Sequence, residues 1–381
     1  MASSVFLQAT KAIYQLARPL VFRQSAQDAH HRVMDLLARS DNNEALLSAV
    51  RVVNNLAFQN AELTVGGVTL PHPFILAAGF VKGLGFADER TALAAIKQNV
   101  NLIPGWRTVP ALVGPVEFGS FTRYPRTGNP GVVMWRDKGT FSTQNRIGLK
   151  NPGAVAAAAF LSVNKHHIPP TFGINIAVSP GVSDPDEEKT HVIDSINSFI
   201  ARGVYPSWFT LNLSCPNTED DPEGNQTEHG ARELCGAVID ALAHSNAETG
   251  RNFPLWVKIS PNLSEEQYSA LMRAFDETGA KAVIATNTLP APAPDDPNTI
   301  AGVGGGKLHE AAVNTTRILT TEARQHGYAV DVIGCGGVQD PQSYRNFVSA
   351  GAKAVQYWSS MIYRGPLVAA LIQNEVANDG I

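Results

Sequence analysis

The stretch DVIGCGGVQDPQSYRNFVSAGAKAVQYWSS, residues 331–360, contains the repeating unit that decides the fold. An apolar run, DVIGC, leads into a glycine turn and a helical stretch, and a second apolar run, AVQYW, follows. Continuous apolar runs that alternate with helices are typical of a parallel sheet covered on both faces. The same alternation extends outward to about residue 61, and the eight runs are FILAAG (74–79), VEFGSF (116–121), FGINI (172–176), WFTLNL (208–213), LWVKI (255–259), AVIAT (282–286), DVIGC (331–335) and AVQYW (354–358).

Eight such units in about 300 residues predict an α/β protein whose residues 61–381 form a (β/α)8 TIM barrel. A doubly wound open sheet is the alternative architecture for this pattern. The composition fits either, because 44% apolar residues in a 381-residue chain can bury a large core. The net charge of −4 has nearly balanced signs, so we expect no nucleic-acid partner.

Residues 1–60 have a different pattern and predict a small N-terminal helical domain. Apolar side chains recur at helical spacing from Phe6 to Phe22 and again from Ala29 to Leu37. Pro19 interrupts the first series and predicts two short helices there rather than one. Residues 1–40 carry five Lys or Arg and two Asp, a balance of +3. A basic amphipathic pair could lie on an anionic membrane surface, and a helical cap packed on the barrel is an equally good interpretation.

Three features that the sequence lacks bear on where in the cell the protein is expected. The three cysteines lie far apart without a CxxC pair, so we expect neither a disulfide framework nor a metal site. No apolar run reaches the 18 residues of a membrane span, and the N-terminus lacks a secretory signal. We therefore expect a protein peripheral to the cytoplasmic side of a membrane, or otherwise cytoplasmic.

Glycines and small polar residues follow the last two predicted strands. In a TIM barrel the active site lies at the carboxyl ends of the strands, and phosphate is often bound after strands seven and eight. Gly336 and Gly337 let backbone N–H groups approach an anion, and Ser359 follows Trp358 after the eighth run. A tight turn that needs glycine for its backbone angles is the alternative, and the position in the barrel favours a phosphate cradle.

Asparagines end several of the other predicted strands: Asn175, Asn212, Asn217 and Asn287. A single Asn at a strand end is usually a turn former, but four at one barrel mouth indicate a site that binds amides and imides. Lys82 and Lys258 add positive charge that suits an anionic substrate or a reduced flavin. A solvated surface position is the alternative for either lysine, yet Lys258 lies inside an apolar run, where an unpartnered charge is costly.

Cys215 lies in the loop after the fourth predicted strand. It could be a packed apolar residue, a base or a nucleophile. Because no histidine is adjacent to activate it, we favour a proton-accepting base.

The motifs together resemble dihydroorotate dehydrogenase. They are LAAGF-K at 76–82, NRIGLKN at 145–151, NLSCPNT at 212–218, VKISPNLS at 257–264, ATNT at 285–288, IGCGG at 333–337 and IYRGP at 362–366. The N-terminal ARPLVFRQSAQDAHH (17–31) is similar to the extension of the membrane-associated, quinone-using class 2 members. The resemblance implies an FMN enzyme that oxidises dihydroorotate to orotate in pyrimidine biosynthesis.

The resemblance also implies roles for individual residues. Cys215 and Lys82 are the implied catalytic residues, and Arg136 matches an arginine near the quinone tunnel of class 2 members. The implied substrate contacts are Lys82, Asn145, Arg146, Ile147, Gly148, Leu149, Asn212, Asn217, Asn287 and Thr288. The implied FMN contacts are Ala78, Gly79, Ser120, Asn175, Asn212, Lys258, Thr286, Gly306, Gly336, Gly337, Trp358 and Ser359.

Three departures from the family pattern bear on function. Class 2 members usually have serine as the base, whereas Cys215 resembles class 1. Residues 99–115 look like an insertion before the second strand, and the loop after NLSCPNT lacks the usual Pro-Gly-Leu-Arg continuation. The chain could therefore use a soluble acceptor or another cyclic amide or dihydropyrimidine. A lyase with Lys258 as a Schiff-base amine and a catalytically inactive binding protein are the more distant alternatives.

Overall fold

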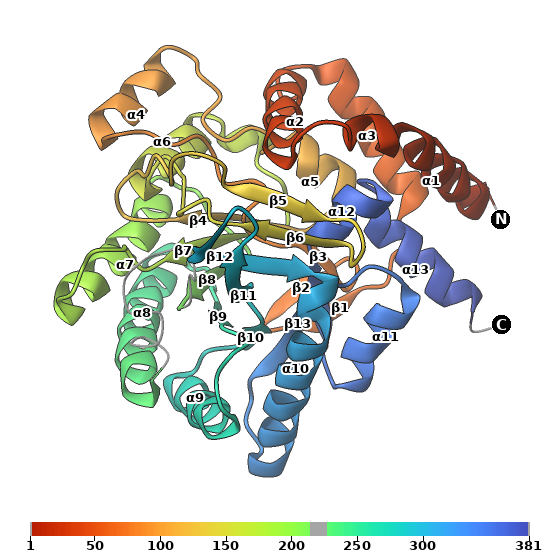
Figure 1. The fold of residues 1–381 in the computed structure, drawn as a ribbon. Coiled ribbons are helices and arrows are strands. Elements are labelled where there is room, and N and C mark those ends of the chain that lie inside the picture. The colour runs from red at the N-terminus through yellow and green to blue at the C-terminus, as the bar shows by residue number, and fades with distance from the viewer. Residues whose placement is uncertain (1, 214–226, 380–381) are drawn as a thin grey trace.

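Eight parallel strands close into a barrel at the centre of the molecule (Figure 1). The coordinates are a computed structural model that describes residues 2–213 and 227–379. The strands pair in chain order around the barrel and are β3 (Phe74–Leu76), β4 (Val116–Phe121), β7 (Phe172–Ala177), β8 (Trp208–Asn212), β9 (Leu255–Ile259), β10 (Ala282–Ala285), β13 (Asp331–Cys335) and β14 (Ala354–Tyr357). Each of the eight apolar runs forms one of them. The TIM-barrel prediction is confirmed, and the open-sheet alternative is wrong because the sheet closes on itself.

Helices cover the outside of the barrel, which explains why its strands are apolar on both faces. They are α4 (Glu89–Lys97), α6 (Ala154–Val163), α7 (Pro185–Ile200), α8 (Glu228–Thr249), α9 (Glu265–Thr278), α10 (Gly306–His326), α11 (Pro341–Ser349), α12 (Ser359–Arg364) and α13 (Val368–Asn378), with a 3₁₀ turn at Lys165–His167. Side-chain caps define several starts: Asp88 begins α4, and Ser264 and Gln267 form a capping box on α9.

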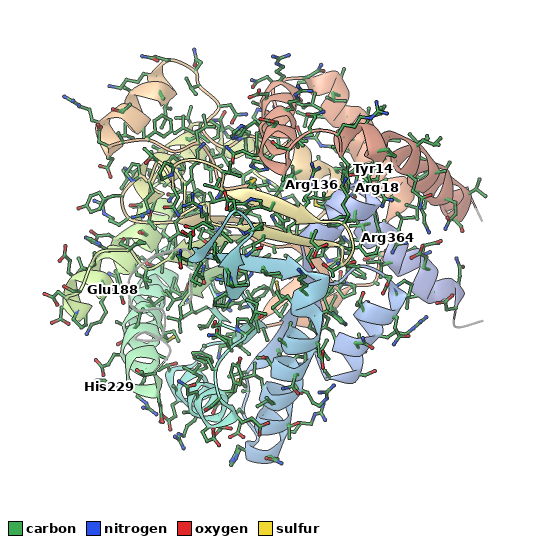
Figure 2. The ribbon with its side chains drawn as sticks, viewed as in Figure 1. Tyr14, Arg18, Arg136, Glu188, His229 and Arg364 are labelled. Carbon is green, nitrogen blue, oxygen red and sulfur yellow. The ribbon has the colours of Figure 1, made fainter. Side chains whose placement is uncertain are left out.

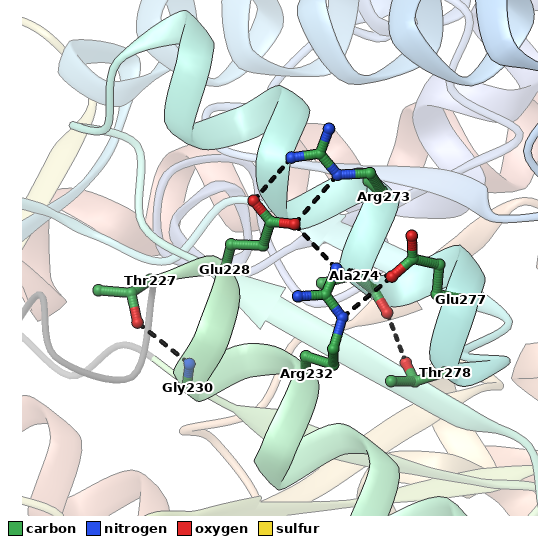
Figure 3. Close-up of polar contacts among 8 residues, drawn as sticks. All are labelled: Thr227, Glu228, Gly230, Arg232, Arg273, Ala274, Glu277 and Thr278. Carbon is green, nitrogen blue, oxygen red and sulfur yellow. Dashed lines mark hydrogen bonds and ion pairs between the residues drawn. The ribbon is translucent and has the colours of Figure 1, made fainter.

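A charge network joins the start of α8 to α9 (Figure 3). The Arg273 guanidinium donates to both oxygens of Glu228, and Arg232 donates to Glu228 and to Glu277. Hydrogen bonds from Arg273 and Arg232 lower the pKa of Glu228 to about 2. The network therefore fixes the first turn of α8 at neutral pH, although its exposure limits its contribution to stability.

The three N-terminal helices lie along one side of the barrel beside α12 and α13 (Figure 1). They are α1 (Ala2–Val21), α2 (Ala26–Ser40) and α3 (Glu44–Ala57), and all three lie within residues 1–60. The prediction of two short helices before residue 22 is wrong, because α1 is continuous through Pro19. Pro19 lies in the last turn, and the carbonyl of Gln15, whose usual N–H partner it removes, belongs to an exposed residue.

Specific contacts attach α1 to the barrel. The hydroxyl of Tyr14 donates to the carbonyl of Ile362 at 2.7 Å, and Arg18 donates to the carbonyl of Tyr363 at 2.7 Å. Lys11 pairs with Glu375 at 3.0 Å. None of the helices in the described ranges combines the length and apolar character that a membrane span requires.

Residues 99–115 lie between α4 and β4 and contain the short helix α5 (Thr108–Val113), which packs against α2 and α3. The fully buried carboxylate of Asp41, at the end of α2, accepts hydrogen bonds from the backbone N–H groups of Gly105, Arg107 and Thr108. The segment therefore holds the N-terminal helices against the barrel.

Two antiparallel sheets were not predicted. A hairpin of β1 (Leu63–Val65) and β2 (Val68–Leu70) closes on a Gly-Gly turn, a signal that the sequence carries. The second sheet has the order β11-β12-β6-β5 and consists of β5 (Met134–Asp137), β6 (Ser142–Asn145), β11 (Leu289–Ala293) and β12 (Asp296–Gly305). It runs across the front of the barrel in Figure 1. Its strands come from the loops after β4 and β10, so it brings residues of both loops to the mouth.

Candidate active site

A cavity of about 410 Å³ lies at the carboxyl ends of the barrel strands and continues to the N-terminal helices. Its walls come from the barrel, from the antiparallel sheet and from α1 and α2. The predicted site residues that line it are Ala78, Gly79, Lys82, Ser120, Asn145, Ile147, Gly148, Leu149, Asn175, Asn212, Lys258, Thr286, Asn287, Thr288, Gly336, Gly337, Trp358 and Ser359.

Four predicted residues lie elsewhere or outside the described chain. Arg146 is not among the lining residues, and its guanidinium donates to the carbonyls of Val132 and Pro130. Gly306 begins α10, while its neighbours Gly304 and Gly305 line the cavity in its place. Cys215 and Asn217 lie outside the described residues.

Two of the asparagines at the strand ends lie in hydrogen-bond contact. Asn287 donates through Nδ2 to the Oδ1 of Asn212 at 3.3 Å, and Asn212 donates to the Oγ of Ser120 at 3.4 Å. Their backbones follow or end β10, β8 and β4, which meet at one end of the barrel. The amides therefore belong to one polar wall.

Asn175 is the strongest sign of a ligand in this wall. It is fully buried on β7, and neither Nδ2 nor Oδ1 has a hydrogen-bond partner within the described protein. A buried amide without partners destabilises the fold, because it has lost the hydrogen bonds that it would make with water. Because Asn175 lines the cavity, a ligand with both a donor and an acceptor edge would satisfy it.

Lys258 projects from β9 and is only 5% exposed. Its ammonium group donates to the Oε1 of Gln356 at 3.1 Å and to the Sγ of Cys335 at 3.6 Å. Burial raises the pKa of the Cys335 thiol, and the nearby Lys258 opposes that shift. Two of the three N–H groups of Lys258 are thus used within the barrel, and the third is available to the cavity.

The cavity wall that follows β13 contains two glycines, Gly336 and Gly337, at positions without room for a Cβ atom. Gly337 has a φ of +67°, and a Cβ there would lie 2.6 Å from the carbonyl oxygen of Gly305. The hydroxyl of Ser359 is 2.7 Å from that of Thr143, and both residues line the cavity. Small residues and hydroxyl donors at this position fit an anion such as phosphate.

The cavity also has an apolar limb beside the N-terminal helices. Its walls include Val21, Ala26, Ala29, His30 and Val33, from the end of α1 to the middle of α2. The sequence signals for them are the likeness of residues 17–31 to the class 2 extension and the helical spacing of apolar residues, and that spacing is equally typical of helix packing.

Polar groups occur at three points of this limb. Burial, with the nearby Lys82 as a second cause, lowers the pKa of His30 to about 3, so its imidazole is neutral. Tyr14 and Arg136 also line the limb, and Figure 2 shows them together with Arg18 beside the N-terminal helices. Arg136 donates to the carbonyl of Gln24 and lies 4.5 Å from the ring centre of Phe22.

Comparison with known proteins identifies similar chains. The family model described as dihydroorotate dehydrogenase matches residues 60–379. A protein named dihydroorotate dehydrogenase (quinone) from Chloroflexus aurantiacus is 30% identical over 94% of both chains, and one of that name from Neisseria gonorrhoeae is 29% identical over 93% of this chain and 96% of its own. The crystal structure of a DHODH from Eimeria tenella in complex with ferulenol superposes with a TM-score of 0.74 at 22% identity and covers 95% of this chain and 94% of its own. At that identity the structural likeness concerns the fold alone.

Proposed function

The chain belongs to the dihydroorotate dehydrogenase family, and we propose that it oxidises dihydroorotate to orotate in pyrimidine biosynthesis, with FMN as cofactor and a quinone as electron acceptor. The observation that carries this proposal is the continuity of one cavity. It runs from the asparagine wall and Lys258 in the barrel to the apolar limb between the N-terminal helices. Such a cavity can hold a polar ring, a flavin and an apolar acceptor in sequence.

The residues present fit FMN. The partnerless amide of Asn175 and the available N–H of Lys258 suit a ring edge that carries donors and acceptors. Gly336, Gly337 and Ser359 would hold the phosphate. When bound, FMN would supply the acceptor for a hydride and so for two electrons.

The substrate would lie against the asparagine wall. Lys82 would pair with the carboxylate of dihydroorotate, while Asn145, Asn212 and Asn287 would bind its ring amides. Formation of the C5–C6 double bond of orotate requires loss of a proton from C5 and a hydride from C6. Cys215, which lies outside the described residues, would take the C5 proton, and its thiolate would be the active form.

The quinone would occupy the apolar limb. One of its carbonyl oxygens could accept a hydrogen bond from Arg136, and the neutral ring of His30 could donate to the other. A quinol forms when the two electrons are joined by two protons, so groups that can move protons belong at this point.

Membrane attachment would be peripheral and on the cytoplasmic side. Ile13, Leu16 and Leu20 on α1 are 67%, 80% and 59% exposed, and their spacing places them on one face. Together with the +3 balance of residues 1–40, this face suits the surface of an anionic membrane from which a quinone could enter the limb.

The test begins with the purified protein. We expect a yellow protein with the absorbance of oxidised flavin, stoichiometric FMN after denaturation, bleaching by dihydroorotate without oxygen, and recolouring by a soluble quinone. A colourless protein that cannot be loaded with FMN would refute the proposal and favour the lyase or binding alternatives.

A soluble acceptor or another dihydropyrimidine remains the second candidate, because Cys215 resembles the class 1 base. Bleaching by dihydroorotate with no recolouring by quinone would favour a soluble acceptor. Bleaching only by a different dihydropyrimidine would change the substrate.

A further inference from the structure

A buried carboxylate lies behind Lys258, inside the barrel. Glu117 on β4 is fully buried and does not line the cavity. Its Oε2 accepts from the Nε2 of Gln356 at 2.9 Å. The same Gln356 accepts at Oε1 from the ammonium of Lys258 at 3.1 Å. One side-chain amide therefore joins an anion in the barrel interior to a cation at the cavity wall.

Side chains of β8 contact the other oxygen of Glu117. Its Oε1 accepts from the hydroxyl of Thr210 and from the Nε1 of Trp208 at 3.4 Å, both on β8. Among the described residues, both oxygens of Glu117 thus accept hydrogen bonds, an arrangement that suits a carboxylate. Because the ammonium group of Lys258 can only donate, the amide of Gln356 has its oxygen toward Lys258 and its nitrogen toward Glu117.

We propose that Glu117 is a positioning residue that acts through Gln356 on Lys258 and sets the reduction potential of a flavin bound at the cavity. The carboxylate fixes the amide, and the amide directs the ammonium group toward the cavity wall. The negative charge of Glu117 also repels the negative charge that a flavin gains on reduction, because the low-dielectric interior of the barrel screens this repulsion only weakly. The proposal rests on the FMN site of the proposed function.

The separation of Glu117 and Lys258 sets the expected size of the change in reduction potential. The path from the carboxylate along the two hydrogen bonds and the amide to the ammonium nitrogen is about 8 Å long. At a separation of about 8 Å and an effective dielectric constant of about 20, a unit charge changes the equilibrium constant of a reaction that adds a charge roughly 30-fold. A flavin in contact with Lys258 would lie farther from Glu117 than the ammonium does. We therefore expect about a tenfold effect on the equilibrium between oxidised and reduced flavin, which is about 30 mV for a two-electron couple.

The first variant is Glu117→Gln in the flavin-loaded protein. Removal of the buried charge should raise the potential by about 30 mV, measured by anaerobic titration against a dye of known potential. The matched control is Asp331→Asn, the same chemical change at the start of β13, where the carboxylate pairs with Lys353 at 2.6 Å. We expect its potential to equal that of the wild type, because this pair is partly exposed and screened.

A double variant, Glu117→Gln with Gln356→Glu, moves the carboxylate one step toward the cavity. The carboxylate introduced at position 356 would accept from Lys258 and from the amide introduced at position 117, whose oxygen would accept from Thr210 and Trp208. Every hydrogen bond of the wild type has a counterpart, so the proposal requires this variant to fold and hold flavin. Its potential should fall below that of the wild type.

Opposite shifts in the two variants support the proposal, and a merely structural role for Glu117 would not produce them. Potentials equal to the control, shifts in the same direction, or loss of flavin from the double variant would overturn it. If Glu117→Gln does not fold, the double variant decides alone. A wild-type protein without flavin would instead refute the proposed function, and that outcome is visible before any variant is made.

Discussion

The replacement Asp41→Asn should loosen the N-terminal helices from the barrel. The carboxylate is fully buried, and its Oδ2 accepts from the Nδ2 of Asn101 at 2.8 Å and from the N–H of Gly105 at 2.7 Å. Its Oδ1 accepts from the N–H groups of Arg107 and Thr108 and from the Thr108 hydroxyl, at 3.2, 2.9 and 2.8 Å. An asparagine keeps the shape but turns one of the two oxygens into an NH₂ group that accepts nothing.

The asparagine loses fewer hydrogen bonds if its NH₂ group replaces Oδ2, which accepts two, than if it replaces Oδ1, which accepts three. In that orientation the Nδ2 of Asn101 and the N–H of Gly105 are buried without an acceptor. Each unsatisfied group costs about 1–3 kcal/mol, and a partial turn of the Asn101 side chain would recover some of that. We expect the free energy of unfolding to fall by about 2–4 kcal/mol, measured by urea unfolding. Hydrogen exchange should accelerate in α2 and in residues 99–115 before it does so in the barrel.

The control is Asp35→Asn on the exposed face of the same helix, which should stay within about 0.5 kcal/mol of the wild type. If Asp41→Asn is no less stable than this control, the buried carboxylate does not hold the N-terminal helices, and residues 99–115 have another role.

Four further predictions concern the site and its surroundings. Deletion of residues 1–40 should reduce quinone-dependent turnover more than turnover with a soluble dye; equal losses would make the segment a structural cap. Cys215→Ala should retain FMN and bind orotate but slow flavin reduction by about 10²–10⁴-fold, and stopped-flow reduction at the wild-type rate would exclude Cys215 as the base. His30 has a pKa of about 3 in the folded protein and an ordinary value of 6.5, so the fold is stabilised only while its ring is neutral. The free energy of unfolding should therefore fall as pH drops from 6.5 toward 3. His30→Gln should flatten this pH dependence, and His31→Gln, at an exposed position, should not. Glu228, with a pKa of about 2, contributes stability above pH 4.5 that disappears as pH falls through 2, so the stability difference between wild type and Glu228→Gln should shrink across that range, and a constant difference would argue against the network of Figure 3.

The parts of the site that could be predicted from sequence are those that follow directly from strand ends. Each barrel strand carries its own apolar run, and closure brings the carboxyl ends of all eight together. Asn212 and Asn287 are 75 residues apart in the chain, yet they form a hydrogen bond because their strands end at the same rim. The sequence of each strand end was sufficient to predict these residues, because the strands of the barrel neighbour one another in chain order and all end at the same rim.

The sequence by itself therefore determined the barrel, the polar character of its mouth and the presence of a helical N-terminus. Only the tertiary structure decided that Pro19 lies within a continuous helix, that Asp41 receives donors from residues 99–115, and that His30 faces the same cavity as Asn175. It alone also shows that Glu117, Gln356 and Lys258 form one chain of hydrogen bonds across three strands. These features depend on which side chains meet across elements far apart in sequence, and a pattern of apolar and polar residues carries the period of each element but not the identity of its neighbours.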